Sequence, residues 1–161
     1  MTANEYNNCV DQYADAVYRF ILKSVKDVDK AKDIVQESFT RMWEKLDDIS
    51  YAKAKSYLFT TAYHTMIDTF RRDKRLTVFD ELPMHHFTTE NQYSDLKEVL
   101  NEAIDQLPSI QKSVLLLRDY EGYSYEEIGR MTNLNESQVK VYIFRARAFL
   151  KNYIGSLDRV M

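Results

Sequence analysis

The residues best suited to chemistry lie near the C-terminus, where basic side chains recur along one predicted helix. Lys140, Arg145 and Arg147 stand there among apolar residues that repeat at helical spacing. A helix that is held by an apolar stripe and leaves Lys and Arg outside suits the major groove of DNA. The alternative is an ordinary helical hairpin whose charges meet only solvent. The pattern favours DNA binding.

This basic helix is the second half of a predicted helix-turn-helix. Ser124 and Glu127 have the spacing of a capping box, which begins the first helix. Asn135 and Gln138 repeat the capping pattern before the second helix. Asn133 supplies the turn between them, since asparagine tolerates the left-handed backbone conformation. Local hydrogen bonds therefore predict both helix starts.

The predicted core of this unit is a set of apolar residues at helical spacing on both helices. Gly129 lies beside them, where a small residue would let a second helix cross closely. The expected core residues are Ile128, Met131, Val139, Ile143, Ala146 and Leu150.

Composition indicates an all-α protein. The 161 residues include only 3 Gly and 2 Pro, which leaves little material for hairpins and turns. No apolar run reaches the roughly 18 residues of a membrane span, and the first residues lack the basic and apolar segments of a secretory signal. The single cysteine, Cys9, cannot form an internal disulfide, which fits a reducing compartment. We expect a cytoplasmic protein.

The net charge of -3 conceals an uneven distribution along the chain. Residues 51–76 carry +4 and residues 110–161 carry +2, whereas residues 1–50 carry -3 and residues 77–109 carry -6. Local sign governs contact with phosphates, so overall acidity does not exclude a nucleic-acid partner. It does argue against indiscriminate coating of DNA.

Three helices are expected before residue 76, over about 4–26, 29–46 and 54–74. The third is rich in aromatic residues and ends in a basic cluster, Arg71, Arg72, Lys74 and Arg75. The helix dipole favours cations at this end by roughly 0.3–1 kcal/mol each. Aromatic rings beside cations are equally typical of a site for single-stranded nucleic acid. Both interpretations stay open.

Two domains are predicted. Residues 77–94 lose the helical period, and an unstructured loop of that length is uncommon inside one compact domain. His85 and His86 lie in this stretch without further ligands nearby, so we expect no metal site. The expected fold is two small helical domains, 1–76 and 95–161, joined by a flexible linker over 77–94. The second is a four-helix domain that contains the helix-turn-helix.

Three segments together carry a family resemblance: DIVQESFTRMWEKL, AKSYLFTTAYHTMIDTFRRDKR and LPSIQKSVLLLRDYEGYSYEEIG. In order and spacing they resemble the extracytoplasmic-function group of the bacterial sigma-70 family, whose members keep only regions two and four. The resemblance covers nearly the whole chain. It implies a sigma factor that binds core RNA polymerase through the beta-prime clamp and the beta subunit. It also implies promoter-specific initiation through the -10 and -35 elements.

The resemblance implies that the first of these segments docks on polymerase. Gln and carboxylate side chains beside bulky apolar ones can form a partly polar helix-on-helix interface. An intradomain core role for Phe39, Met42 and Trp43 is the alternative. The implied docking residues are Asp33, Gln36, Glu37, Phe39, Met42 and Trp43.

The second segment and the loop Ser50–Lys55 before it match the part that opens and reads the -10 element. Flipped bases are captured there by stacking. Many relatives have Asn where this chain has His64, so the role of that Asn cannot be carried over. The implied base-contact residues are Lys53, Lys55, Tyr57, Tyr63 and His64, and the implied phosphate contacts are Arg71, Arg72, Lys74 and Arg75.

The basic helix matches the reader of the -35 element in the major groove. First turns usually read bases and later turns hold phosphates. Gln138 could pair with adenine, and Lys140 or Arg145 with guanine. The expected base contacts are Ser137, Gln138, Lys140, Val141 and Arg145, and the expected backbone contacts are Arg147 and Lys151.

The resemblance further implies an anti-sigma factor as a partner, and no cofactor, metal or small-molecule substrate. The acidic linker would either mimic RNA in the polymerase channels or act as a plain tether. Two other classes remain. A dimeric one-component regulator would share the helix-turn-helix but would not explain the N-terminal pattern. Asp33, Glu37 and Glu44 invite a metal-hydrolase hypothesis, but no Glu-x-x-His pair or nucleophile motif accompanies them, so we expect no enzyme.

Overall fold

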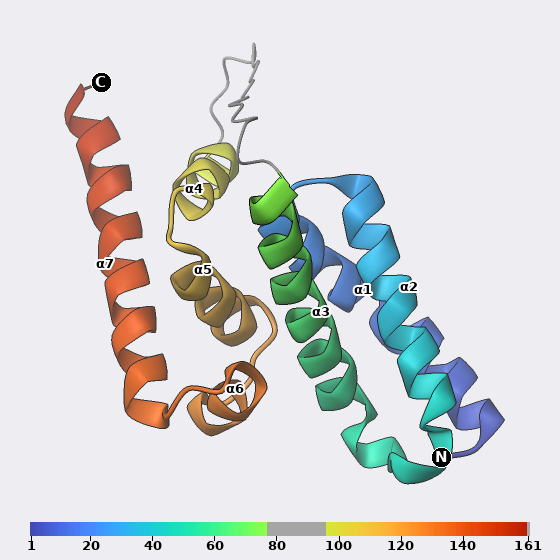
Figure 1. The fold of residues 1–161 in the computed structure, drawn as a ribbon. Coiled ribbons are helices and arrows are strands. Elements are labelled where there is room, and N and C mark those ends of the chain that lie inside the picture. The colour runs from blue at the N-terminus through green and yellow to red at the C-terminus, as the bar shows by residue number, and fades with distance from the viewer. Residues whose placement is uncertain (77–95, 161) are drawn as a thin grey trace.

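The computed structural model describes residues 1–76 and 96–160, and every regular element within them is helical (Figure 1). The all-α prediction is confirmed. The predicted linker, with His85 and His86, lies outside the described residues. Among the described helices, none is both long and apolar enough to cross a membrane. The α-helices are α1 (Ala3–Val25), α2 (Val28–Glu44), α3 (Ala54–Leu76), α4 (Leu96–Asp105), α5 (Ser109–Leu115), α6 (Tyr125–Thr132) and α7 (Glu136–Val160).

The first three helices form one bundle. Thr2 and Glu5 make the capping box that begins α1, and Lys26 ends it in the left-handed conformation with φ 59°. Asp27 then caps α2 by accepting a hydrogen bond from the Lys30 amide at 3.0 Å. These neighbouring caps reverse the chain within a few residues. The core between the helices is fully buried and includes Val17, Phe20, Ile21, Met42, Leu58, Phe59 and Met66.

The connection from α2 to α3 is a pair of 3-10 turns, η1 (Leu46–Asp48) and η2 (Tyr51–Lys53). Ile49 between them is buried. The N-terminal ammonium of Met1 donates to the carbonyl oxygens of Leu46 and Ile49 at 3.1 and 3.2 Å. This anchor holds the connection in place and leaves the following residues, from Ser50 to Lys53, exposed.

The second domain contains the predicted four helices, with a short π-helical segment, η3 (Leu116–Tyr120), after α5. Helix α7 packs across α4, α5 and α6. All the core residues expected for the helix-turn-helix are buried except Leu150, which is half-buried.

The turn chemistry of the helix-turn-helix is confirmed. Ser124 and Glu127 exchange hydrogen bonds at 3.1 and 2.8 Å, and Asn133 is left-handed with φ 62°. Asn135 and Gln138 exchange bonds at 3.0 and 2.8 Å. A small residue is needed at position 129, but the predicted reason, a close helix crossing, was wrong. A Cβ there would lie 2.7 Å from the carbonyl oxygen of Leu134, so the close neighbour is the turn itself and no crossing helix.

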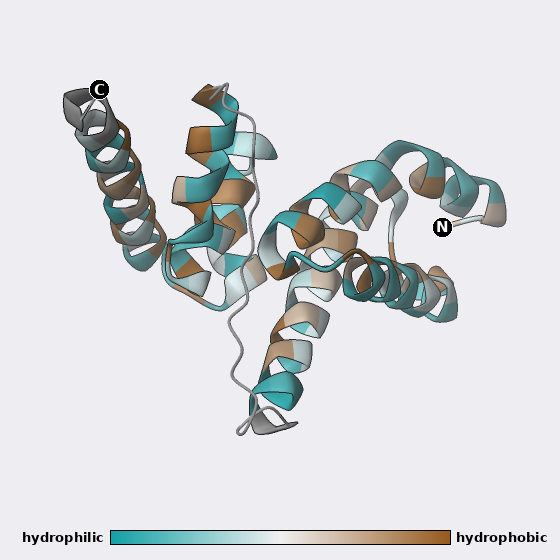
Figure 2. Cartoon of the chain, turned by 90° about the horizontal axis from the view of Figure 1, so that it is seen from above, coloured by the Kyte–Doolittle hydropathy of each residue, from teal (hydrophilic) through white to brown (hydrophobic). Residues whose placement is uncertain are grey.

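The two domains pack against each other. Helix α3 contacts α6, and α1 contacts α5, so one cluster of buried residues runs through both domains. Figures 1 and 2 place α7 and α2 toward opposite ends of the molecule, with the interface between them. No pattern in the sequence indicates this relative placement, which has consequences for the sites described below.

Candidate polymerase and nucleic-acid interfaces

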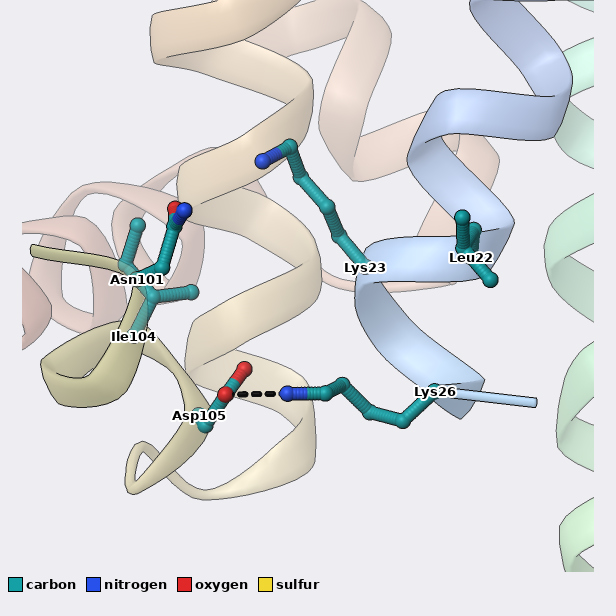
Figure 3. A pocket seen from close by; sticks show the side chains of 6 residues that line it. All are labelled: Leu22, Lys23, Lys26, Asn101, Ile104 and Asp105. Atoms are coloured by element: carbon teal, nitrogen blue, oxygen red, sulfur yellow. Dashed lines mark hydrogen bonds and ion pairs between the residues drawn. The ribbon is translucent and has the colours of Figure 1, made fainter. Parts of the chain in front are cut away.

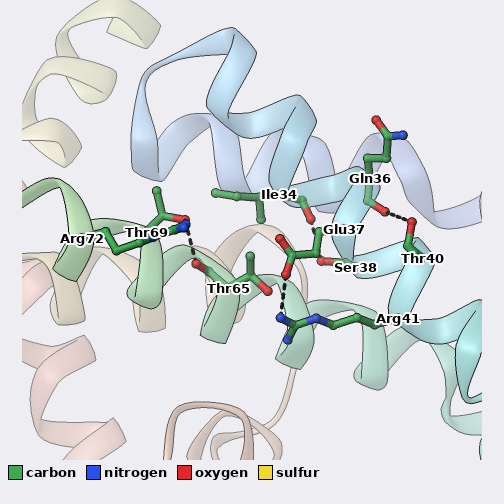
Figure 4. A network of polar contacts seen from close by, with 9 residues as sticks. All are labelled: Ile34, Gln36, Glu37, Ser38, Thr40, Arg41, Thr65, Thr69 and Arg72. Carbon is green, nitrogen blue, oxygen red and sulfur yellow. Dashed lines mark hydrogen bonds and ion pairs between the residues drawn. The ribbon is translucent and has the colours of Figure 1, made fainter.

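The outward face of α2 carries four of the six predicted docking residues. Asp33, Gln36 and Glu37 are exposed, and Trp43 is 51% exposed although its ring packs edge-on against Tyr6 at 5.0 Å. Glu37 accepts a hydrogen bond from Arg41 at 2.6 Å along the same face (Figure 4). The face therefore combines polar groups with one large aromatic ring.

The other two predicted docking residues lie in the bundle core. Met42 is fully buried and Phe39 is 8% exposed. Tyr6 donates its hydroxyl to the carbonyl of Phe39 at 3.0 Å, which ties α1 to α2. Because Phe39 and Met42 hold α2 in place, neither side chain is available to a partner in this fold. Their effect on docking would be through the position of α2.

The predicted -10 loop forms one wall of a cleft of about 580 Å³. Lys53 and Tyr57 line it from the first domain, together with Ser50 and Thr60. The opposite wall is α6, through Glu127 and Arg130. Residues of the predicted -10 loop thus face the first helix of the helix-turn-helix across one cleft.

The structure brings Tyr57 and His64 to a neighbouring cleft of about 430 Å³, beside Arg41 and Thr61. His64 is half-buried and meets the Tyr63 ring edge-on at 5.4 Å. Tyr63 itself is only 6% exposed, and burial raises the pKa of its phenol. Tyr57 and His64 therefore line an open cleft, whereas the Tyr63 ring packs against His64 from the core.

The basic end of α3 is exposed, as a phosphate contact requires. Arg71 lies 3.8 Å from the Asp68 carboxylate, and Arg72 donates weakly to the Thr69 hydroxyl at 3.5 Å (Figure 4). Lys74 is exposed. The side chain of Arg75 lies outside the described part of the chain. Such weak surface contacts leave Arg71 and Arg72 able to reorient toward a partner.

The predicted -35 helix, α7, presents most of its expected base contacts to solvent. Ser137, Val141 and Arg145 are exposed, and Arg145 has no ion-pair partner among the described residues. Lys140 lies 3.3 Å from the Glu136 carboxylate and 5.6 Å above the Tyr125 ring.

Gln138 also takes part in the capping box of α7, and this role restricts its use as a base contact. Its Oε1 accepts the Asn135 amide in the capping box, which occupies one of the two lone pairs of that oxygen and fixes the orientation of the side chain. A bidentate pair with adenine needs both the oxygen and the NH₂ group. The NH₂ group can donate to a base without loss of the capping bond.

Arg147 is committed within the domain. Its guanidinium donates two hydrogen bonds to the Asp119 carboxylate, at 2.5 and 3.1 Å. These bonds raise the pKa of Arg147 and link α7 to the π-helical segment η3. Lys151, one turn further on, is exposed.

One exposed residue of α7 does not belong to the set predicted from the sequence. Phe144 is 73% exposed and follows Val141, itself 44% exposed, by three residues on the helix. Apolar side chains in the major groove contact thymine methyl groups. The signal was present in the sequence, because Phe144 is a large apolar residue outside the buried stripe of Val139, Ile143 and Ala146.

No group of three or more His, Cys, Asp or Glu side chains within the described residues could hold a metal ion.

Comparison with known proteins covers both domains. Residues 9–76 match the Sigma-70 region 2 family, and residues 97–150 match the Sigma-70, region 4 family. The ECF RNA polymerase sigma factor SigM of Bacillus subtilis is 33% identical over 144 residues, which cover 86% of this chain and 88% of SigM. The RNA polymerase sigma factor SigV of the same organism is 30% identical over 153 residues, 93% of this chain and 91% of SigV.

Two solved structures share the fold. The sigma factor RpoE from Bartonella quintana, in complex with the anti-sigma factor NepR, matches with a TM-score of 0.81 at 21% identity, over 95% of this chain and 98% of RpoE. CnrH in complex with the cytosolic domain of CnrY matches with a TM-score of 0.68 at 23% identity, over 94% of this chain and 88% of CnrH. Both matches extend across the two domains.

Proposed function

This chain belongs to the sigma-70 family as an extracytoplasmic-function RNA polymerase sigma factor, and we propose which of its surfaces performs each part of that function. It binds core RNA polymerase and directs promoter-specific transcription initiation through the -10 and -35 elements. We assign residues 1–76 to region two and residues 95–161 to region four.

The polymerase-docking surface is the outward face of α2. Exposed Gln36, Glu37 and Trp43 support this assignment, because they combine hydrogen-bonding groups with a ring that remains half outside the bundle. Partly polar faces with an aromatic anchor are typical of protein interfaces. Phe39 and Met42 hold this face in position from below.

The -10 surface is the pair of clefts beside the α2–α3 connection. Tyr57 lines both of them, and His64 and Lys53 line one each. Aromatic rings beside cations can stack bases and attract phosphates, with about 1–3 kcal/mol per stacked base. The exposed Arg71, Arg72 and Lys74 continue the positive surface along α3.

The -35 surface is the outer face of α7. Arg145, Lys140 and one hydrogen bond from Gln138 supply polar contacts to base edges, and Val141 with Phe144 supplies apolar contacts to thymine methyl groups. Lys151 would contact the DNA backbone. The exposure of this helix, on a helix-turn-helix whose capping bonds are all formed, is the observation that carries the assignment.

Three further properties belong to the proposal. The chain works in the cytoplasm, where its polymerase is found, and it catalyses no reaction of its own. The chain also has an anti-sigma factor as a partner, as RpoE of Bartonella quintana has in NepR.

Transcription of genomic DNA from the source organism tests the proposed function. Purified chain and core polymerase should start transcripts at a set of sites that share one -10 and one -35 motif when the 5′ ends are sequenced. Trp43→Ala should abolish most starts by weakening docking, whereas Asn152→Ala, an exposed change late in α7, should not. Start sites identical with and without the chain would contradict the proposal.

A further inference from the structure

A pocket of about 380 Å³ lies between α2 and α3, inside the first domain, and is here called the Thr65 pocket. Glu37 and Arg41 line it from α2. The lining residues from α3 are Thr65, Asp68, Arg71 and Arg72. Figure 4 shows Thr65 beside Glu37 and Arg41. Neither Thr65 nor Arg41 was predicted from the sequence to bind a partner.

The Thr65 hydroxyl is the unusual group in this pocket. Thr65 is 4% exposed, and its Oγ1 is buried without a hydrogen-bond partner among the described residues. Buried polar side chains nearly always have such a partner, because their lost hydration is otherwise not compensated. The hydroxyl of Thr69, one turn later, donates to the carbonyl of Thr65 at 2.9 Å in the usual helical way. The unpaired Thr65 hydroxyl is therefore available to a hydrogen-bonding ligand.

The charges around this hydroxyl favour an anion. Three guanidinium groups and two carboxylates line the pocket, which leaves one positive charge in excess. Arg41 donates to Glu37 at 2.6 Å, and Arg71 lies 3.8 Å from Asp68. These four side chains are 44% to 70% exposed, and such surface pairs are weak enough to exchange for another partner. Arg72, the third cation, has only a 3.5 Å contact with a threonine hydroxyl.

The Thr65 pocket adjoins the cleft that Tyr57 and His64 line, here called the base cleft. Arg41 lines both of them, and Thr65 directly follows His64 on α3. The base cleft has rings that can stack a base, whereas the Thr65 pocket has hydroxyl and guanidinium donors that suit a phosphate. The base and the phosphate of one nucleotide are covalently joined, so sites for the two groups must be neighbours. The base cleft and the Thr65 pocket meet this requirement.

A second pocket with several cations lacks these properties. It has a volume of about 290 Å³ and lies between α1 and α4, where Lys23, Lys26 and Asp105 line it (Figure 3). Lys26 pairs with Asp105, and the Lys23 ammonium lies 5.1 Å above the Tyr120 ring. None of its lining residues has a buried side-chain oxygen or nitrogen without a partner in the described part of the chain. The Thr65 pocket is the better site for an anion.

We propose that Thr65 and Arg41 hold one phosphate of the captured -10 strand in the Thr65 pocket, next to the nucleotide whose base enters the base cleft. The site rests on the proposed function and deepens it, because it gives the captured nucleotide a second point of attachment. The Thr65 hydroxyl donates to one phosphate oxygen, and Arg41 exchanges the Glu37 carboxylate for the same phosphate. Arg71 and Arg72 contact this phosphate from the last turns of α3.

Thr65→Val tests the site, because valine has nearly the same shape as threonine and removes only the hydroxyl. Loss of an unpaired buried hydroxyl should leave the free energy of unfolding unchanged or raise it. Binding of the complex with core polymerase to a single-stranded -10 oligonucleotide from one of the mapped promoters should weaken by about tenfold, the loss of one hydrogen bond to a charged group. Thr40→Val is the matched control and should not change binding, because the exposed Thr40 hydroxyl donates to the Gln36 carbonyl at 2.9 Å outside the pocket (Figure 4).

Oligonucleotides with a single neutral methylphosphonate linkage identify the phosphate. In the wild-type complex, neutralisation of one linkage in the -10 strand should weaken binding more than neutralisation of any other. In the Thr65→Val complex the same linkage should matter less, because one of its two kinds of donor is already gone. A loss at this linkage that is equally large in both complexes would show that Thr65 does not contact the phosphate.

Other results would also overturn the site while the wild-type complex still binds the oligonucleotide. One is equal binding by Thr65→Val and wild type. Another is weaker assembly of Thr65→Val with core polymerase, because the pocket would then receive a polymerase side chain. Failure of the wild-type complex to bind any -10 oligonucleotide would instead contradict the proposed function, so the two failures are distinguishable.

Discussion

The two proposed promoter-reading surfaces of this sigma factor differ in how far the packed domains expose them. Helix α7 lies at one end of the molecule, and Val141, Phe144 and Arg145 face solvent (Figure 1). The predicted -10 loop lies at the end of the first bundle beside the N-terminus (Figure 1), and α6 forms the facing wall of its cleft. Both surfaces are basic or aromatic, so composition does not distinguish them. Their positions relative to the domain interface distinguish the two surfaces.

This difference means that the packed domains restrict the space around one surface more than around the other. The exposed face of α7 has room for duplex DNA. Capture of flipped bases at the proposed -10 surface needs space around Tyr57 and Lys53, where α6 faces them across the cleft.

Removal of the Tyr123 ring should have the largest effect on this comparison. Truncation of a buried aromatic residue costs about 3–5 kcal/mol in a protein core, and here the loss falls on the contact between domains. Calorimetry of Tyr123→Ala should show the two domains unfolding separately, whereas wild type should unfold in one transition. Tyr120→Ala, which removes an exposed ring 5.1 Å from the Lys23 ammonium, is the control and should keep one transition. A single transition in Tyr123→Ala would show that its ring does not join the domains.

Arg145→Ala should have the next largest effect, confined to the exposed surface. One good bidentate contact discriminates between bases by about 1–3 kcal/mol. Transcription from templates with a randomised -35 element should lose its preference at one base pair, without a change in the radius of gyration. A loss of transcription of similar size on every template would indicate that Arg145 contacts DNA phosphates instead of bases.

Two substitutions of Gln138 separate its capping role from base reading. Gln138→Ala removes the reciprocal bond of the capping box and should lower the stability of the chain by about 0.5–1.5 kcal/mol. Gln138→Glu keeps the acceptor of the capping box and should preserve stability, but it loses the NH₂ donor. Thermal unfolding and the randomised -35 templates measure the two effects. An unchanged -35 preference in Gln138→Glu would show that Gln138 serves the capping box and does not read a base.

The smallest effect is expected for Arg147→Ala. Its ion pair with Asp119 is partly exposed, and such pairs contribute about 0.2–1 kcal/mol. The melting temperature should fall slightly, and all promoters should weaken alike if Arg147 also holds a phosphate. Asp119→Ala is the control, because it breaks the same pair and leaves the guanidinium in place. A stability loss with unchanged promoter activity would restrict Arg147 to a structural role.

Local features of this chain were predictable because their causes are local. The capping box of Ser124 and Glu127 and the left-handed Asn133 depend on residues within a few positions of each other. The buried stripe of α7 follows from helical spacing for the same reason. At Gly129 the need for a small residue was predicted correctly, but the neighbouring atom was not, because it belongs to the turn geometry.

Exposure and domain placement were harder to predict. Helical spacing does not show whether Met42 or Trp43 of the same helix faces a partner, and the structure buries the first while the second remains half exposed. The contact of Tyr123 with Phe59 joins residues far apart in the sequence, and no local pattern marks it. The assignments of individual residues to DNA and polymerase stay predictions.

The distance between the domains, free and on the promoter, tests the central claim most directly. Cys9 is the only cysteine and is buried, so a Cys9→Ala chain can carry fluorescent dyes on new cysteines at the exposed positions Asp15 and Asn152. Energy transfer should be high in the free chain and should fall sharply when core polymerase and a promoter fragment are added. Equal transfer in both states would contradict the account.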